Sequence, residues 1–398
     1  MSEKRHLSAH NLGQSGSDFG TSIAILFNWK KTFSNWMISA IECHYFHYRT
    51  GQGHMSGRRH MAGGLEIPSC DSCAKPAILH QDYSGRTLCG VHLVESVRKR
   101  VSRTLRQQLT LPKSSTRNGE DDRTTILVAI SGGKDSAVLL ERIHSILGQR
   151  PDVHIVAGCV DEGITDYRSP SMEFARKLAD GLGIEFITTS YPELGFEEMD
   201  KVVELLPKIR QQHGEAKGMA PCSYCGVFRR SGLNHLAKVS GADFMALGHN
   251  LDDMAQSVLM NMQKGDLDRT LRLAPHTSRP LTGIAPRIVP LQWVPEQEIH
   301  AYAMYLELPF FHDECPHAPG ALRQRHREFI AALEADVPGS RHGFLHTAER
   351  LKELHETAYP GVFDEHSANS CQRCGSMTSG EVCKACEMMD WIGQAGST

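Results

Sequence analysis

From Thr125 onward, short apolar runs alternate with helical segments, and this alternation constrains the fold more than any other feature of the sequence. Residues 126–130 are wholly apolar, as is typical of a parallel strand that is buried on both faces. The alternation predicts an α/β fold with a doubly wound, mostly parallel sheet. The further predicted strands are 155–160, 184–189 and 244–247, and the predicted helices are 136–147, 171–182, 226–239 and 252–263.

The first predicted strand runs into a hexapeptide that opens a helix, and ligands of doubly wound sheets bind at such strand ends. Two adjacent glycines let backbone amides turn inward, and these amides form an anion site together with the helix N-terminus. Lys134 adds positive charge and Asp135 is a candidate Mg²⁺ ligand, whereas the spacing of a Walker A loop is absent. A tight structural turn is the alternative for a glycine pair alone. The hexapeptide consists of Ser131, Gly132, Gly133, Lys134, Asp135 and Ser136.

This hexapeptide resembles the PP-loop of the ATP-pyrophosphatase superfamily. The resemblance implies an enzyme that grips the β,γ-pyrophosphate of ATP, transfers AMP to a substrate oxygen and releases pyrophosphate. Residues 248–253 are similar to the second signature of that superfamily, and Asp161 closes another strand where its members contact nucleotide or substrate. Helix capping is the alternative role for Asp252, which leaves Asp253 as the candidate catalytic acid. The implied nucleotide contacts in these two segments are Asp161, Gly248, His249 and Asp252.

Three cysteines form a set of three ligands near the middle of the chain: the C-x-x-C pair Cys222 and Cys225, and Cys315 far downstream. A structural zinc site takes four ligands, whereas three thiolates suit a [4Fe-4S] cluster with one iron left open. One alternative is a redox dithiol of the pair, with the third cysteine as a persulfide carrier. Another is a zinc ion that takes His312 or His317 as its fourth ligand.

Two further ligand groups lie nearer the ends of the sequence and have the count and spacing of tetrahedral zinc sites. The chain has 12 cysteines, and thiols at such spacings indicate metal ligands in a reducing compartment, where disulfides are rare. Their role is either folding support, since zinc stabilises segments too small for a core, or RNA docking. The first knuckle consists of Cys70, Cys73, Cys89 and His92, and the second knuckle of Cys371, Cys374, Cys383 and Cys386.

The PP-loop, the P-C-S-x-C-G segment and the distant E-C-P segment together resemble the TtcA/TtuA family of tRNA thiolases, and the knuckles resemble its 2-thiouridine branches. The resemblance implies that Cys222, Cys225 and Cys315 hold an oxygen-sensitive [4Fe-4S] cluster and that two zinc ions fill the knuckles. It also implies that uridine O2 attacks the α-phosphate of ATP, after which sulfide from the open iron attacks C2 and AMP leaves. The target base has to leave its stack to enter such a site.

A few residues bear on the branch within this family. Phe228-Arg229-Arg230 and Met254 resemble the cytoplasmic wobble-uridine thiolases of archaea and eukaryotes, whereas the C-x-x-H of the first knuckle resembles TtuA. TtuA is thought to use a lysine at the position of Arg229. Arginine keeps the charge but does not lose a proton, so we expect Arg229 to stabilise charge in catalysis, alongside Lys134 and Asp253. Wobble and T-loop uridines are both compatible targets.

The charge balance bears on the partners of the protein. A net charge of −3, from 43 basic and 46 acidic residues, excludes a uniformly basic surface but allows a local basic face. The stretch 97–113, which begins within a predicted helix at 91–109, is basic and free of acids, and it fits either a solvated face or a grip on tRNA phosphates. A second candidate comprises Arg323, Arg325 and Arg327. The expected partners are tRNA, a ubiquitin-like thiocarboxylated sulfur carrier protein and a second copy of the chain in a homodimer. No membrane is expected, because no apolar stretch is long enough to span one, and the expected location is cytoplasmic.

The sequence predicts four parts: an atypical extension at 1–65, the first knuckle with a basic helix at 66–112, a PP-loop catalytic domain with the iron–sulfur site at 122–345, and the second knuckle at 366–392. A physiological start at Met61 is one explanation of the extension. Two other functions stay open: a PP-loop enzyme that adenylates a different substrate, as in tRNA cytidine 2-thiolation or a ligase, and a zinc-dependent RNA-binding protein. The intact hexapeptide argues against the latter.

Overall fold

A computed structural model describes residues 59–62, 65–111, 123–277, 284–319, 322–360, 369–378 and 380–397. The predicted extension up to residue 58 and residues 112–122, between the basic helix and the PP-loop domain, lie outside the described residues. Among the described helices, none is long and apolar enough to cross a membrane. The division of the chain into four parts stays a prediction.

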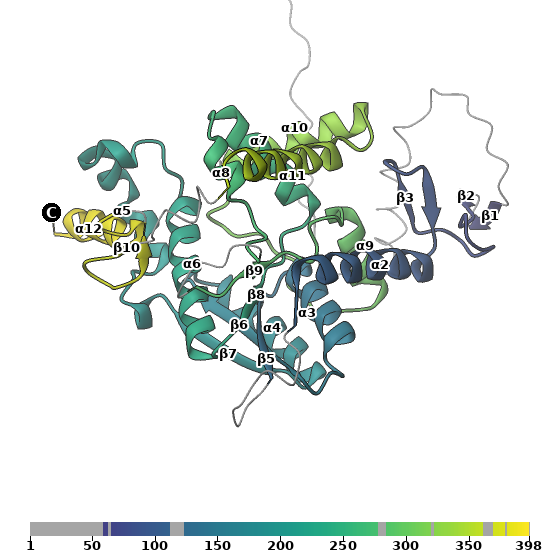
Figure 1. Ribbon diagram of the computed structural model, residues 1–398, viewed down its shortest axis with the longest axis horizontal. Helices are drawn as coiled ribbons and strands as arrows, with labels where there is room; N and C mark the ends of the chain where they lie inside the picture. Colours follow the sequence, from purple (N-terminus) through teal and green to yellow (C-terminus); the bar gives the residue numbers. More distant parts are fainter. Residues whose placement is uncertain are drawn as a thin grey trace, which may run out of the picture. The chain divides into compact units, whose positions relative to one another are not determined.

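The main sheet of the described residues has five parallel strands in the order β7-β6-β5-β8-β9 (Figure 1). β5 pairs with β6 on one side and with β8 on the other, so Ile126 lies opposite both Ile155 and Phe244. The strand order reverses between β5 and β8, and this is the switch point at which ligands of such sheets bind. The predicted doubly wound sheet is therefore confirmed, and β9 is an additional strand. The strands are β5 (Thr124–Ala129), β6 (Val153–Asp161), β7 (Glu185–Ser190), β8 (Phe244–Ala246) and β9 (Arg287–Ile288).

Helices cover both faces of this sheet because successive strand residues point to opposite faces. Ile126 and Ile155 belong to the core under α3 and α4, and α9 and α2 extend this layer. Leu127 and Val156 belong to the core on the other face, under α6, against which α5 and α12 pack (Figure 1). These helices are α2 (Gly90–Gln108), α3 (Lys134–Leu147), α4 (Arg168–Leu182), α5 (Met199–Gln212), α6 (Pro221–Val239), α9 (Glu296–Tyr305) and α12 (Lys384–Gly396).

A separate group of four helices packs together beyond the end of β8 (Figure 1). It consists of α7 (Leu251–Gln263), α8 (Leu267–Leu271), α10 (Leu322–Asp336) and α11 (Ser340–Ala358). Arginines of α10 and α11 form ion pairs with the acidic residues at the start of α7. This group therefore borders the strand ends where a ligand is expected.

The first knuckle is attached to α9 and α2 by a buried polar contact. The turn between β3 and β4 carries Tyr83, whose hydroxyl donates to Glu298 of α9 over 2.8 Å. Glu298 is fully buried and also pairs with Arg100 of α2. The short elements are β1 (Arg59–Ala62), β2 (Leu65–Pro68), β3 (Leu79–Gln81), β4 (Arg86–Leu88), η2 (Pro192–Leu194), η3 (Gly214–Ala216), β10 (Asn369–Ser370) and β11 (Met377–Thr378).

Candidate active site and metal centres

The glycine-containing loop after β5 has the backbone geometry of an anion cradle. Gly132 has a φ of 88°, and a Cβ on it would lie 1.9 Å from the Ser171 carbonyl oxygen, so only glycine fits there. The loop closes on itself, because the Ser131 amide donates to Ser136 Oγ over 3.1 Å. Among the described residues, the amides at 132–135 have no hydrogen-bond acceptor. These amides at the start of α3 fit the phosphate groups of a nucleotide.

The carbonyl side of this loop is held by two distant segments. The Ser131 carbonyl accepts a hydrogen bond of 2.8 Å from Arg168. The Gly132 carbonyl accepts one of 2.8 Å from the amide of Phe311, four residues before Cys315. The loop is therefore tied directly to the segment that carries one of the three middle cysteines.

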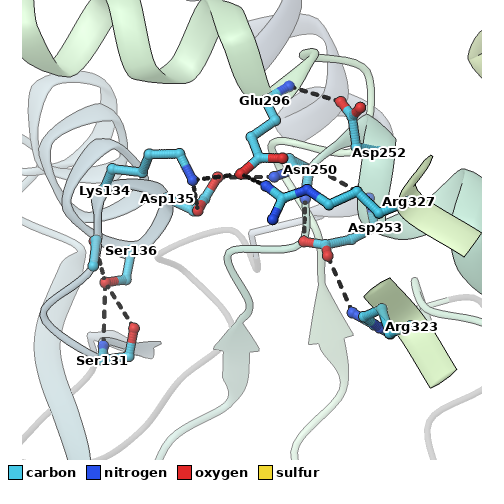
Figure 2. A network of polar contacts seen from close by, with 11 residues as sticks. Ser131, Lys134, Asp135, Ser136, Asn250, Asp252, Asp253, Glu296, Arg323 and Arg327 are labelled. Carbon is cyan, nitrogen blue, oxygen red and sulfur yellow. Dashed lines mark hydrogen bonds and ion pairs between the residues drawn. The ribbon is translucent and has the colours of Figure 1, made fainter. Parts of the chain in front are cut away.

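Lys134 lies between two carboxylates (Figure 2). Its Nζ is 3.0 Å from Asp135 Oδ2 and 2.7 Å from Glu296 Oε1. Burial alone would lower the pKa of Lys134, but the two carboxylates outweigh it and raise the pKa above its ordinary value. Glu296, at the start of α9, also pairs with Arg327. Sequence reasoning missed Glu296, which holds the lysine predicted to meet phosphate.

Asn250 joins the loops that follow β5 and β8. Its side-chain amide donates to Asp135 Oδ1 over 2.8 Å (Figure 2). A Cβ on Gly248 would lie 3.5 Å from the Asp135 backbone, so the two loops are in close contact. Burial lowers the pKa of His249, which favours its neutral form. The structure therefore brings the two predicted signatures to one place, the switch point of the sheet.

The alternative role of Asp252, helix capping, is not what the structure has. Asn250 is the N-cap of α7, and Asp253 completes a capping box with it. Asp253 also pairs with Arg323 at 3.0 Å. Asp252 instead pairs with Arg341 at 2.9 Å and accepts from the amide of Glu296, and burial raises its pKa. Both aspartates thus have structural partners, and the catalytic role of Asp253 stays a prediction.

The strand end at β6 contributes two acidic residues with different environments. Asp161 accepts from the amide of Gly163 over 2.9 Å and shapes the turn. Glu162 is buried between Arg168, at 2.6 Å, and Arg229, at 2.7 Å. Sequence reasoning named Asp161 and passed over Glu162, whose burial between two arginines is visible only in the fold.

The C-x-x-C pair lies on the first turn of α6, which begins at Pro221 rather than at residue 226 as predicted. Positions i and i+3 of a helix share a face, so Cys222 and Cys225 lie on one side of it. Desolvation raises the pKa values of Cys222 and Cys315, and the negative charge of Cys225 raises both further. The three middle cysteines therefore lie within electrostatic range of one another.

The spacing of the middle cysteines argues against a single metal ion. Ligand atoms within 4.8 Å of one another occur in two groups of three or more among the described residues, and the middle cysteines are in neither. A [4Fe-4S] cluster binds each thiolate through a different iron, which requires wider spacing. The alternative zinc ligand His317 is engaged at 2.6 Å by Asp200, and the His312 ring packs against Phe310 at a tilt of 43°.

Arg229 lies one helical turn after Cys225 on α6, and its side chain reaches the Cys225 sulfur. Its Nη2 donates to Cys225 Sγ over 3.2 Å, and its Nε pairs with Glu162. The Glu162 carboxylate raises the pKa of Arg229 well above its usual range, so the guanidinium stays charged. This contact fits the charge-stabilising role predicted from the sequence.

The two knuckles are the groups whose ligand atoms lie within 4.8 Å. Contacts such as Cys73 Sγ to Cys89 Sγ, 3.7 Å, and Cys374 Sγ to Cys383 Sγ, 3.6 Å, match the spacing of about 3.8 Å around a tetrahedral zinc ion. Backbone hydrogen bonds outweigh burial and lower the pKa of Cys70 to about 6. Similar bonds lower the pKa of Cys371 to about 6. Both groups thus have the donor set and geometry of a metal site.

The two predicted basic faces differ in the structure. On α2, the side chains of Arg98, Arg103 and Arg106 are exposed, and Lys99 pairs with Glu95. On α10, Arg323 pairs with Asp253 and Arg327 pairs with Glu296. The face on α2 is therefore the more accessible of the two for a polyanion.

Comparisons with known proteins place this geometry in a family. Residues 103–333 match the family model described as a PP-loop domain. The tRNA 2-thiolation protein NcsA of Haloferax volcanii is 37% identical over 329 residues, which cover 81% of this chain and 98% of that protein. The cytoplasmic tRNA 2-thiolation protein 1 of Bos taurus is 34% identical, over 82% of this chain and 89% of that protein.

A solved structure agrees with these relatives. The U34-tRNA thiolase NcsA from Methanococcus maripaludis with its [4Fe-4S] cluster has a TM-score of 0.63 and 31% identity, over 80% of this chain and 95% of that one. Sequence, fold and the arrangement of cysteines thus lead to one conclusion. The chain belongs to the PP-loop family of tRNA 2-thiolation proteins.

Proposed function

We propose that the protein is an ATP-dependent tRNA 2-thiouridine synthetase, which adenylates uridine O2 and replaces that oxygen by sulfur at C2. The observation that carries this proposal is the direct contact between the PP-loop and the Cys315 segment, through the Phe311 amide on the Gly132 carbonyl. This contact supports a site in which the activated oxygen and the sulfur source act on the same base. The NcsA relatives and the U34-tRNA thiolase support the same reaction.

The proposed nucleotide site consists of the PP-loop and the segment after β8. The amides of residues 132–135 bind the pyrophosphate portion of ATP, with the hydroxyls of Ser131 and Ser136 beside them. Lys134 exchanges its carboxylate partners for phosphate oxygens, which keeps its charge compensated throughout. Asp135, Asp161 and Asp252 are the candidate ligands for Mg²⁺, and Gly248 and His249 line the nucleotide.

The proposed cluster site uses the three middle cysteines as ligands of a [4Fe-4S] cluster. When bound, such a cluster supplies an open iron coordination position that holds sulfide. Arg229 keeps a fixed positive charge beside Cys225, which offsets the negative charge of three thiolates. Asp253 is proposed to move a proton or orient Mg²⁺ once Arg323 moves to a phosphate.

The proposed partners follow from this reaction. The substrate is tRNA, with the wobble uridine as the favoured target, and the exposed basic face of α2 contacts its phosphates. Zinc in both knuckles stabilises the segments around them. A ubiquitin-like thiocarboxylated protein supplies the sulfur, the chain acts as a homodimer, and it works in the cytoplasm, as the name of the Bos taurus relative indicates for that protein.

The test is an anaerobic reaction of the cluster-loaded protein with a tRNA transcript, ATP, Mg²⁺ and sulfide, followed by mass spectrometry of the nucleosides. We expect 2-thiouridine and one AMP per modified base. Lys134→Ala should lose the product while keeping iron and zinc. Transfer of AMP to another acceptor with release of pyrophosphate, and no thiolated uridine, would overturn the proposal in favour of another PP-loop activity.

A further inference from the structure

Glu162 is a buried carboxylate between two guanidinium groups. Its side chain is 2% exposed, its Oε2 lies 2.6 Å from Arg168 Nε, and its Oε1 lies 2.7 Å from Arg229 Nε. A buried charge is tolerated only when its partners compensate it closely. The two arginines reach different parts of the site, so one carboxylate connects both.

Arg168 fixes one end of this connection to the PP-loop. Its side chain is 4% exposed. It donates to the Ser131 carbonyl over 2.8 Å and to the Val160 carbonyl over 2.9 Å. These bonds to backbone fix the Arg168 guanidinium beside the PP-loop, and its charge attracts Glu162 Oε2, which accepts no hydrogen bond among the described residues.

Arg229 forms the other end, and it differs from Arg168 in exposure. Its side chain is 46% exposed, and a long exposed side chain ordinarily samples several rotamers. Here the Glu162 pair fixes its Nε, which directs its Nη2 to Cys225 Sγ at 3.2 Å. The fork of the guanidinium allows both contacts at once.

We propose that Glu162 is a positioning residue: it holds the Arg229 guanidinium against Cys225 Sγ, and through Arg168 it fixes this contact relative to the PP-loop. The inference rests on the proposed function, because it concerns a cysteine proposed to bind the cluster. A hydrogen bond to a cluster thiolate withdraws negative charge from the cluster and raises its reduction potential. Glu162 thereby sets the electrostatics of the cluster without touching it.

The test is Glu162→Gln in the cluster-loaded protein, with the cluster potential measured by potentiometric titration and EPR. Gln has the same size but does not pair with two arginines. We expect a shifted potential for Glu162→Gln and a lower potential for Arg229→Gln, an altered EPR signal of the reduced cluster, and a fall in thiolation turnover of about 10- to 100-fold, as outer-shell partners of metal sites typically cost. The affinity for ATP, measured by calorimetry, should change far less than turnover.

The matched control for Arg229→Gln is Arg230→Gln, which removes the same positive charge one residue further along α6. Among the described residues, Arg230 donates to no cysteine, so its loss should shift the potential much less. If Glu162→Gln does not fold, Arg229→Gln takes its place in the test, because the Arg229 side chain is half exposed.

The double variant combines Glu162→Gln with Arg229→Gln. In it, the effect of Glu162→Gln that acts through Arg229 should vanish, since the residue that Glu162 positions is gone.

Two outcomes separate this inference from the proposed function. If the wild-type protein binds the cluster and thiolates tRNA, but neither Glu162→Gln nor Arg229→Gln changes the potential or the EPR signal, the positioning role is refuted alone. If the wild-type protein binds no cluster, the proposed function fails first, and the inference fails with it.

Discussion

The knuckles and the middle cysteines share thiolate ligands but differ in how closely these ligands are grouped. In each knuckle the four ligand atoms lie within 4.8 Å of one another. The middle cysteines come from α6 and from a segment about 90 residues downstream, they are not grouped at that distance, and Cys222 is exposed. A closed set of four suits a structural ion, whereas an open set of three beside a nucleotide loop suits chemistry.

The thiols of each knuckle share their charge unequally. Backbone amides lower the pKa of one thiol in each knuckle, Cys70 and Cys371. Desolvation and neighbouring thiols raise the pKa values of Cys89, Cys383 and Cys386. Among the middle cysteines, desolvation and neighbouring thiolates likewise raise the pKa values of Cys222 and Cys315, and Arg229 is the cation beside them.

The largest expected effect is that of Cys222→Ser. Loss of one of three ligands should abolish thiolation, beyond the about 100-fold loss that outer-shell changes cause at most. Zinc content should stay at two ions per chain, because this residue belongs to neither group of knuckle ligands. Nucleoside mass spectrometry and elemental analysis measure the two quantities, and retained thiolation would refute the cluster role.

Cys371→Ser should affect zinc content and stability, and leave the iron content unchanged. The second knuckle should lose its zinc, and α12 should lose its support, because zinc binding supplies folding energy to such segments. We expect a lower melting temperature and a turnover that falls only with the folded fraction, while iron in the folded protein is retained. Scanning fluorimetry with iron and zinc counts checks this. Loss of iron with normal zinc would reverse the assignment of the two sets.

Exposure to air should distinguish the metal group of the middle cysteines from the zinc ions of the knuckles without any substitution. An open, partly exposed cluster is expected to lose iron and sulfide in air, whereas zinc has no redox chemistry and should remain bound. Thiolation should fall severalfold and return after anaerobic reconstitution. Circular dichroism before and after exposure should be unchanged. An activity that is indifferent to air would contradict a cluster-dependent reaction.

The smallest effect is expected for Arg373→Ala in the second knuckle. Arg373 forms a surface ion pair with Asp390, and such pairs contribute little. We expect an unchanged melting temperature and unchanged turnover. The matched change beside the middle cysteines, Arg229→Ala, should reduce turnover clearly. Equal effects of the two arginine changes would mean that the charge beside Cys225 has no special role.

The sequence was sufficient for features that are local. The hexapeptide 131–136, the strands before it and after it, and the ligand spacing of each knuckle follow from residues close together in the chain, and the structure has them as expected. Arg100, counted in the basic stretch, instead turns inward to the buried Glu298. Such a partner, 198 residues away, cannot be inferred from helical periodicity.

The contacts that sequence reasoning missed also join residues that are far apart in the chain. Glu296 meets Lys134 across 162 residues, and Glu162 meets Arg229 across 67, so no local pattern marks either pair. The capping alternative for Asp252 failed for a different reason, because it depended on where a helix begins. α7 begins at Leu251, and the cap therefore falls on Asn250 with Asp253 as its partner. A shift of one residue reassigns every capping role.

The most direct test of this account is native mass spectrometry of the anaerobically purified protein, combined with the Cys222→Ser and Cys371→Ser variants. The account predicts a wild-type mass with one [4Fe-4S] cluster and two zinc ions, a loss of only the cluster in the first variant, and a loss of only one zinc ion in the second. A third zinc ion in place of the cluster, or a cluster that survives Cys222→Ser, would contradict it.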